Sequence, residues 1–440
     1  MKFIVVGGGP AGCAAAYTLS KQGHEVSVFE ATDKIGGRTK HIQIGDFSVG
    51  TGALFLMGGI YPRTSAILKE MGRYDDLIPW GGASELLDND DSRYPVSFVD
   101  LVSYLKIPKL TFGDRAKIVA AGIKLLLSPG AKNPFDGEDL ARFDHGEDLE
   151  SWTRKHLGDR PYEYIMRPLM DFLYAVPCSW MSTPFPIAII QQAYKMKLSV
   201  PPEGPGQVSD WMMENSKNAQ VHLSAPVTAI RQVGEGYEVD ANGETHTADG
   251  LVVATEAFVS AELMKDFISE SSYDKLMAAP YTDYAHVQIG FSRNPWPDYP
   301  VDIVLPVGYG EGPRSIGAMV LQSHRQPSAV PEGGELVGVY FTTPPLEHMS
   351  DEEIKQDALD NVYRAFGKPE EEPEFVHLFH YDKGLNIAKP GSYGKLDAVR
   401  NEMPKGVFLA GDYFSQAGIE AAVFSGERAA IQLMDAASSK

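Results

Sequence analysis

The feature that most constrains the fold lies at the start of the chain, where Gly7-Gly-Gly-Pro-Ala-Gly12 separates an apolar run from an alanine-rich one. The apolar pattern over 3–6 predicts a buried strand, and the pattern over 10–22 predicts a helix that stops at Gly23. Alternation over 24–30 predicts a second strand. A strand, a helix and a parallel strand in this order need a right-handed crossover, so the sequence predicts an α/β fold.

The glycine spacing adds a ligand to this expectation. Gly7 permits a tight turn, Gly9 lets a pyrophosphate approach the backbone, and Gly12 lets the helix pack closely on the strand. The helix that begins at Pro10 and Ala11 presents free N–H groups and the positive end of its dipole to phosphates. Glu30 ends the second strand, where a carboxylate accepts hydrogen bonds from a ribose. Together these features predict a dinucleotide site.

The amino-acid composition of the chain limits the kinds of molecule that it can bind. The formal net charge is −20, which argues against a nucleic-acid partner because phosphate binding needs a basic face. Cys13 and Cys178 are the only cysteines, so the sequence offers neither a disulfide framework nor a Cys-x-x-Cys metal site, and we expect no metal. No apolar run has transmembrane length. These features predict a cytoplasmic protein of two domains.

Further glycine-rich blocks follow in a particular order. They are Ile35-Gly-Gly-Arg-Thr39, Gly50-Thr-Gly-Ala53, Ala410-Gly-Asp412 and the helix-like stretch from Gly418 to Ala430. In order and spacing the chain resembles the superfamily of flavin-containing amine oxidases, protoporphyrinogen oxidases and phytoene desaturases. The resemblance is specific in the nucleotide-binding segments and weak elsewhere. It implies that FAD is the cofactor.

The resemblance assigns roles to particular residues. Gly37 and Arg38 would bring a backbone N–H and a guanidinium to the pyrophosphate. Asp412 would lie near the ribityl chain, Val227 would meet the adenine through its backbone, and the helix that starts near Gly418 would point at the flavin N1–C2 edge. The full set of expected FAD-binding residues is Gly7, Gly9, Pro10, Ala11, Gly12, Glu30, Gly36, Gly37, Arg38, Thr39, Gly52, Ala53, Leu54, Val227, Gly411, Asp412, Gly418, Ile419 and Ala422.

The resemblance also implies the domain organisation. We expect a Rossmann-like FAD-binding domain, made of residues 1–84, 207–265 and 396–440, interleaved with a mixed α+β substrate-binding domain, made of residues 85–206 and 266–395. No second strand–glycine–helix fingerprint is present, so a separate NAD(P)H domain is not expected. Electrons would come from a small organic substrate and leave to oxygen, a quinone or another acceptor.

Two departures from the amine oxidase pattern affect the predicted reaction. Such enzymes hold a lysine near flavin N5, and here the matching strand position is His286 or its neighbour. They also place an aromatic residue just before the last helix, where this chain has Gly418. Both departures favour the branch that resembles protoporphyrinogen oxidases and desaturases. His286 is a candidate catalytic residue, although a histidine in such a strand is more often structural.

The expected reaction is therefore oxidation of a bulky, largely apolar substrate by hydride transfer to flavin N5. The aromatic and Met-rich stretch from Tyr162 to Tyr194 is the candidate substrate lining, with Met170, Tyr174 and Tyr381 as candidate contacts; such a stretch is equally typical of plain core. Three alternatives remain open: an amine oxidase with an atypical site, a redox-neutral flavin isomerase, and a non-catalytic flavin-binding protein.

One basic segment stands out on an acidic chain. Residues 101–132 carry six basic residues against one acidic residue, Asp114. With an apolar run over 118–127, the segment allows contact with a membrane surface. The alternative, which we favour by about two to one, is a helix that covers the substrate cavity and presents a solvated basic face.

Overall fold

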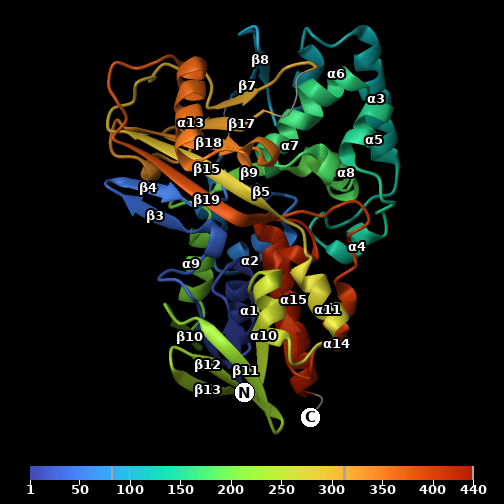
Figure 1. Cartoon of the computed structure of the whole chain (residues 1–440), viewed down its shortest axis with the longest axis vertical. Helices are drawn as coiled ribbons and strands as arrows, with labels where there is room; N and C mark the ends of the chain where they lie inside the picture. The colour runs from blue at the N-terminus through green and yellow to red at the C-terminus, as the bar shows by residue number, and fades with distance from the viewer. Residues whose placement is uncertain (81–82, 99, 311–313, 439–440) are drawn as a thin grey trace.

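The computed structural model describes residues 1–80, 83–98, 100–310 and 314–438 (Figure 1). A parallel five-stranded sheet contains the strand that leads into the first glycine loop. Its strand order is β10 (Ala219–His222), β2 (Glu25–Phe29), β1 (Lys2–Val6), β14 (Gly250–Val253) and β20 (Val407–Leu409), and every neighbouring pair is parallel. The central strands are buried on both faces, as their continuous apolar runs require. The predicted α/β fold is confirmed.

Two helices from opposite ends of the chain pack together on this sheet. Helix α1 (Pro10–Lys21) lies against α15 (Ile419–Ser438). Their approach is close enough that a Cβ added at Gly426 would lie 1.9 Å from the carbonyl oxygen of Ala11, and one added at Gly12 would lie 1.8 Å from that of Gly7. Only glycine fits at either position.

Smaller elements surround this sheet. An antiparallel sheet of β11 (Val227–Val233), β12 (Gly236–Ala241) and β13 (Glu244–Ala248) lies beside it. The adjoining helices are α9 (Gln207–Glu214), α10 (Ala257–Met264), α11 (Glu270–Met277) and α14 (Asp397–Glu402). The division of the chain into the two sets of residues given above remains a prediction.

A seven-stranded sheet builds the other half of the molecule. Its order is β19 (Phe375–Asn386), β15 (Tyr281–Phe291), β18 (Glu335–Phe341), β17 (Ile316–Leu321), β16 (Ile303–Pro306), β7 (Ser84–Leu87) and β8 (Arg93–Val96). Helix α13 (Asp351–Phe366) covers one face of this sheet. The sequence analysis did not predict the hairpin β7–β8, in which β7 pairs in parallel with β16 from a distant part of the chain.

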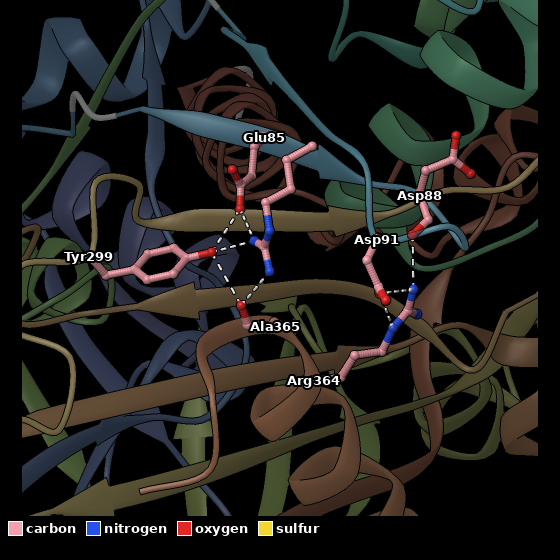
Figure 2. Close-up of polar contacts among 7 residues, drawn as sticks. Glu85, Asp88, Asp91, Tyr299, Arg364 and Ala365 are labelled. Atoms are coloured by element: carbon pink, nitrogen blue, oxygen red, sulfur yellow. Dashed lines mark hydrogen bonds and ion pairs between the residues drawn. The ribbon is translucent and has the colours of Figure 1, made fainter.

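Polar contacts attach this hairpin to α13 (Figure 2). Arg93 donates to the Glu85 carboxylate, to the Tyr299 hydroxyl and, at 2.7 Å, to the carbonyl of Ala365. Arg364 of α13 donates to the carbonyl of Asp88 at 2.9 Å and to the Asp91 carboxylate at 3.0 Å. The hairpin is therefore fixed to α13 at its turn end, through Asp88, Asp91 and Arg93.

The remaining elements connect the two halves. Strands β3 (His41–Ile44) and β4 (Phe47–Gly50) form a hairpin, and β5 (Leu56–Gly58), β9 (Lys197–Val200) and β6 (Ile78–Pro79) form a small sheet next to α2 (Pro62–Glu70). A helical layer lies along one edge of the molecule (Figure 1). It consists of α3 (Phe112–Leu127), α4 (Gly137–Ala141), α5 (Leu149–His156), α6 (Asp159–Pro161), the π-helical turn Tyr162–Met166, α7 (Arg167–Tyr174) and α8 (Pro184–Gln192).

One buried carboxylate links α15 to α2, and its removal gives a first prediction. Glu420 is fully buried and accepts the backbone N–H groups of Arg63, at 2.7 Å, and Thr64, at 2.8 Å, at the start of α2. The Glu420→Ala variant leaves both N–H groups without this acceptor, at about 1–3 kcal/mol each. We expect its thermal unfolding midpoint to fall by several degrees.

The control for this prediction is Glu427→Ala, because Glu427 binds only the partly exposed side chain of Arg63 and should contribute much less. Burial raises the pKa of Glu420 from its ordinary value of 4.5 to about 7. The free energy of unfolding that comes from protonation of Glu420 is therefore fully present below about pH 4.5 and is lost as the pH rises through 7. The Glu420→Gln variant should lack that pH dependence; an unchanged profile would contradict the assignment.

Candidate cofactor and substrate site

A cleft of about 1090 Å³, including its solvent-open part, lies where the glycine-rich loops of the first half meet β15, β18 and β19 of the second. Ten of the residues in its wall were expected cofactor contacts. They are Pro10, Arg38, Thr39, Gly52, Ala53, Leu54, Asp412, Gly418, Ile419 and Ala422.

The first glycine loop is shaped to admit a ligand. Gly7 has a φ of +101°, in the region that favours glycine, and makes the turn from β1 into α1. A Cβ at Gly9 would meet no atom within 4 Å, so this part of the loop faces open space at the N-terminus of α1. The Gly36 N–H donates to the carbonyl of Gly8 at 2.8 Å and holds the second glycine loop beside the first. The next residue, Gly37, lies close to the first loop: a Cβ added at Gly37 would be 3.3 Å from the Cα of Gly9.

Glu30 follows directly after β2 and is buried. One oxygen accepts the Gly8 N–H at 2.7 Å, and the other accepts the backbone N–H and hydroxyl of Thr32, both at 2.8 Å. These bonds orient the carboxylate beside the glycine loop. A carboxylate has about four acceptor positions, so it retains capacity for a ribose hydroxyl.

Arg38 and Asp412 meet in the cleft although they lie far apart in the sequence. The Arg38 guanidinium donates to both Asp412 oxygens, at 2.9 and 3.1 Å, and to the carbonyl of Gly384 at 2.7 Å. Both bonds to Asp412 come from one nitrogen, Nη2. A guanidinium is also a good donor to a phosphate. Asp412 is held in turn by its place just after Gly411, whose N–H donates to the Ser425 hydroxyl at 3.1 Å.

The last helix begins in the cleft wall. Gly418 precedes α15, and Ile419 and Ala422 from its first turn also line the cleft. A Cβ at Gly418 would lie 3.5 Å from the ring of Phe135, a buried residue outside the expected substrate stretch. The helix N-terminus directs its positive dipole end toward the cleft, as expected from the sequence.

Aromatic and apolar side chains make the opposite wall. Tyr174 and Tyr381, both predicted as substrate contacts, lie in it, and the Tyr381 hydroxyl donates to the carbonyl of Thr51 at 3.1 Å. Met170 does not lie in it: it is buried in the hydrophobic core, one turn earlier on α7. Phe172 and Leu173, from the stretch expected to line the substrate site, also lie in it. The wall contains further residues that the sequence analysis missed, namely Phe55, Met57, Tyr61, Tyr284 and Tyr340.

His286 lies behind this wall. It is fully buried, its ring stacks between Tyr340 and Phe379, and its Nδ1 is 2.9 Å from the Nε2 of Gln288. Burial lowers its pKa to about 4, so the ring is neutral at physiological pH. The cleft surface at this point is Tyr284 and Tyr340. A catalytic role for His286 stays a prediction, and the geometry allows it to act only through these neighbours.

Val227 is the expected residue farthest from the cleft. It begins β11 and is partly exposed, and it is not part of the cleft lining. The backbone of Ala225, two residues earlier, donates to the carbonyl of Glu30 at 2.8 Å. Val227 therefore lies near the Glu30 end of the glycine loop, and its contact with adenine remains a prediction.

These residues fit FAD. The open backbone at Gly9, the helix N-terminus behind it and the carboxylate of Glu30 suit a dinucleotide, while Arg38 and the start of α15 lie in the same cleft as the aromatic wall. The fold and the site thus define an α/β protein that binds a flavin dinucleotide next to an organic substrate. Among the described residues, no group of three or more His, Cys, Asp or Glu side chains is arranged to hold a metal ion.

Comparisons with known proteins give the family. The model of the flavin-containing amine oxidoreductase family matches residues 10–434, and the chain belongs to this family. A structure described as a protoporphyrinogen oxidase of Exiguobacterium sp. 255-15 has a TM-score of 0.75 at 20% identity and covers 98% of this chain and 99% of its own. The expected cofactor, FAD, is confirmed at the level of the family.

Curated relatives match over shorter segments. The putrescine oxidase of Kocuria rosea is 31% identical over 161 residues, which is 36% of this chain and 31% of the relative. A 4,4'-diapophytoene desaturase of Methylomonas sp. is 43% identical over 89 residues, 20% of this chain and 17% of the relative. The matched segments thus span less than a third of either relative. These matches support the assignment as a flavin oxidoreductase and do not identify the substrate.

A second prediction concerns Glu30. The Glu30→Gln variant keeps the shape of the side chain but removes the charge, and a hydrogen bond to a charged group contributes about 1.5–3 kcal/mol. We expect the Kd for FAD to rise by about tenfold or more. Titration of the apoprotein with FAD, followed by flavin fluorescence, measures this change. Asp33→Asn, a nearby exposed carboxylate, is the control; equal affinity of Glu30→Gln and wild type would exclude Glu30 as the ribose ligand.

Proposed function

We propose that this protein is an FAD-dependent oxidoreductase that dehydrogenates a bulky, largely apolar organic substrate. The observation that carries the proposal is the charge balance of the cleft. Among the described residues that line it, the charged side chains are Arg38 and Asp412, and they bind each other. The cleft therefore offers no uncompensated carboxylate to a substrate ammonium group.

The wall chemistry supports the same substrate class. Phe55, Phe172 and Leu173 give the cleft its apolar surface, and the tyrosines Tyr174 and Tyr340 add rings with polar tips. Large aromatic side chains bury much apolar area against a ligand, and each such contact contributes about 1.5–3 kcal/mol when fully buried. A rigid conjugated or polycyclic substrate would be held by these contacts alone.

FAD, when bound, supplies the acceptor for a hydride from a substrate carbon. The residues of this chain would orient the substrate and exclude water from the reacting face. Tyr284 and Tyr340 close the wall in front of the neutral His286. The reaction needs no side-chain nucleophile, which agrees with a wall made mainly of aromatic and aliphatic groups.

The test is an anaerobic screen in which loss of visible flavin absorbance reports turnover by conjugated apolar compounds. For any substrate found, we expect Phe172→Ala to lower kcat/KM by about tenfold to a hundredfold, because it removes one large apolar contact. Phe291→Ala is the matched control, since Phe291 is a buried ring that packs on Trp296 and lies outside the cleft. Equal effects of the two substitutions would contradict the assigned wall.

A flavin that stays oxidised with every compound would instead support a non-catalytic flavin-binding protein. Conversion of a substrate without consumption of an acceptor would support an isomerase.

A further inference from the structure

Helix α3 presents an apolar face to solvent. Five of the thirteen exposed large apolar side chains among the described residues belong to this one helix. They are Phe112, Val119, Ile123, Leu126 and Leu127, and Phe112 and Leu127 are 86% and 83% exposed. No residue of α3 is buried. An ordinary surface helix shows the reverse arrangement, with polar residues outside.

These side chains form a single stripe. At about 100° per residue, positions 112, 116, 119, 120, 123, 126 and 127 fall within an arc of about 120°. The opposite side of the helix, at positions 114, 118, 121 and 125, is only partly exposed and packs toward α6 and α8. Lys117 and Lys124 are exposed and lie along one border of the stripe. This result differs from the expected solvated basic face, because the outermost residues are apolar and the lysines flank them.

The helix is fixed in this orientation. At its start, Thr111 and Asp114 form a capping box, and Arg115 donates to the carbonyls of Leu105, at 2.8 Å, and Ile107, at 2.9 Å. At its end, the Gln191 amide of α8 donates to the carbonyl of Leu125 at 2.7 Å. The stripe therefore cannot turn inward without breaking these bonds. Figure 1 shows α3 along the outer edge of the helical layer.

Further exposed groups extend this surface. Lys106 and Lys132 are exposed at the two ends of the helix. Tyr194, which is 77% exposed, follows directly after the α8 residues that hold the end of α3. We define the docking face as the apolar stripe of α3 together with Tyr194 and these four lysines. Its composition is that of a helix that lies in a membrane interface, with apolar groups in the centre, basic groups at the rim and an aromatic ring with a polar tip.

We propose that the docking face binds the surface of an anionic lipid bilayer. The argument for this occupant is charge complementarity, because the face carries exposed lysines on a chain of net charge −20. An antiparallel two-fold dimer through α3 would place the lysine borders of both copies together, which opposes that form of a second copy as the occupant. No helix among the described residues is long and apolar enough to span a bilayer, so the contact is peripheral.

The face also lies next to an apolar pocket. Ile189, Ile190 and Ala193, from α8 and the turn after it, line a small apolar pocket of about 30 Å³ that shares Phe172 and Leu173 with the main cleft. Because α8 is a helix on which α3 packs, a bilayer at the docking face would lie on the same side of the molecule as this pocket. The membrane contact itself does not depend on the proposed reaction.

The test is co-sedimentation of the FAD-loaded protein with vesicles of phosphatidylcholine alone or with one-third phosphatidylglycerol. We expect binding to the anionic vesicles that weakens at high salt. Lys117→Gln with Lys124→Gln should lower the partition coefficient by about thirtyfold, since each lysine near the surface is worth about 1 kcal/mol. Leu126→Ser with Leu127→Ser should lower it by at least about tenfold.

Matched controls carry the same changes on other surfaces. They are Lys217→Gln with Lys405→Gln, and Val233→Ser with Ile431→Ser, all at exposed positions. Retained flavin absorbance shows that each variant is folded. The proposal is overturned if wild type ignores anionic vesicles, if it binds neutral vesicles equally well, or if the α3 variants match their controls. Dimers in sedimentation velocity that Leu126→Ser with Leu127→Ser dissociates, without vesicle binding, would assign the face to a second copy.

Discussion

Replacing Gly12 with valine is expected to abolish recovery of the yellow, FAD-loaded protein. A Cβ at this position would lie 1.8 Å from the carbonyl oxygen of Gly7 and 3.3 Å from Val5, and neither backbone can move away without opening the turn that faces the phosphates. Overpacking of this kind costs about 1–3 kcal/mol or more, and here it also distorts the site. The measurement is the flavin-to-protein absorbance ratio of the soluble fraction.

Gly122→Val serves as the control for this prediction, because a Cβ at Gly122 meets no atom within 4 Å. This variant should be obtained with a normal flavin content. A Gly12→Val protein with wild-type yield and flavin content would mean that α1 does not begin in the geometry described.

Simple primary amines are expected to reduce the flavin at least a hundredfold more slowly than the best conjugated, apolar substrate. An amine must be held with its C–H aimed at the flavin, and orientation of this kind supplies much of the barrier reduction. The resemblance to amine oxidases predicts an aromatic residue at Gly418 and a lysine at or beside His286, and neither is present. In addition, the charges of Arg38 and Asp412 neutralise each other, so this pair offers no free carboxylate to an ammonium group.

Stopped-flow reduction under nitrogen measures this difference, with a panel of monoamines and diamines set against porphyrinogens and polyenes. Because one relative is a putrescine oxidase, diamines are the amines that test this prediction most strictly. Fast reduction by a simple amine would refute the proposal. It would also indicate that another ring of the wall, such as Tyr381, positions the amine.

The sequence predicted the nucleotide-binding half well because its signals are local. The turn at Gly7, the helix after it and the acid at Glu30 lie within one short segment, and each has a steric or electrostatic reason at its own position. Helix α13 has a local signal of the same kind, because Ser350 and Glu353 form the capping box at its start.

The substrate wall could not be predicted in the same way, because it is assembled from distant segments. Phe55, Phe172 and Tyr340 carry no motif, and only the packing of three different elements brings them together. Met170 illustrates the limit of periodicity. It shares a helix face with Tyr174, but the cleft touches only the last turn of α7, so a residue one turn earlier lies in the core.

The hairpin β7–β8 was missed for a related reason. Its strands have four residues each, and Pro95 within β8 weakens the strand pattern. What stabilises them is the parallel pairing with β16 and the contacts of Arg93 and Arg364 with distant residues. Each of these contacts joins residues that are far apart in the sequence, so no local pattern predicts it.

The order of strands in the parallel sheet has a consequence for biosynthesis. Strand β20, at residues 407–409, and helix α15 are synthesised about 400 residues after β1 and α1, yet β20 pairs in the same sheet and α15 packs against α1 and contributes to the cleft. The cleft is therefore incomplete in a nascent chain until the first turn of α15 has been made. At about 5–20 residues per second, the first strand and helix wait many seconds for these partners. During that interval α1 exposes the surface that α15 later covers.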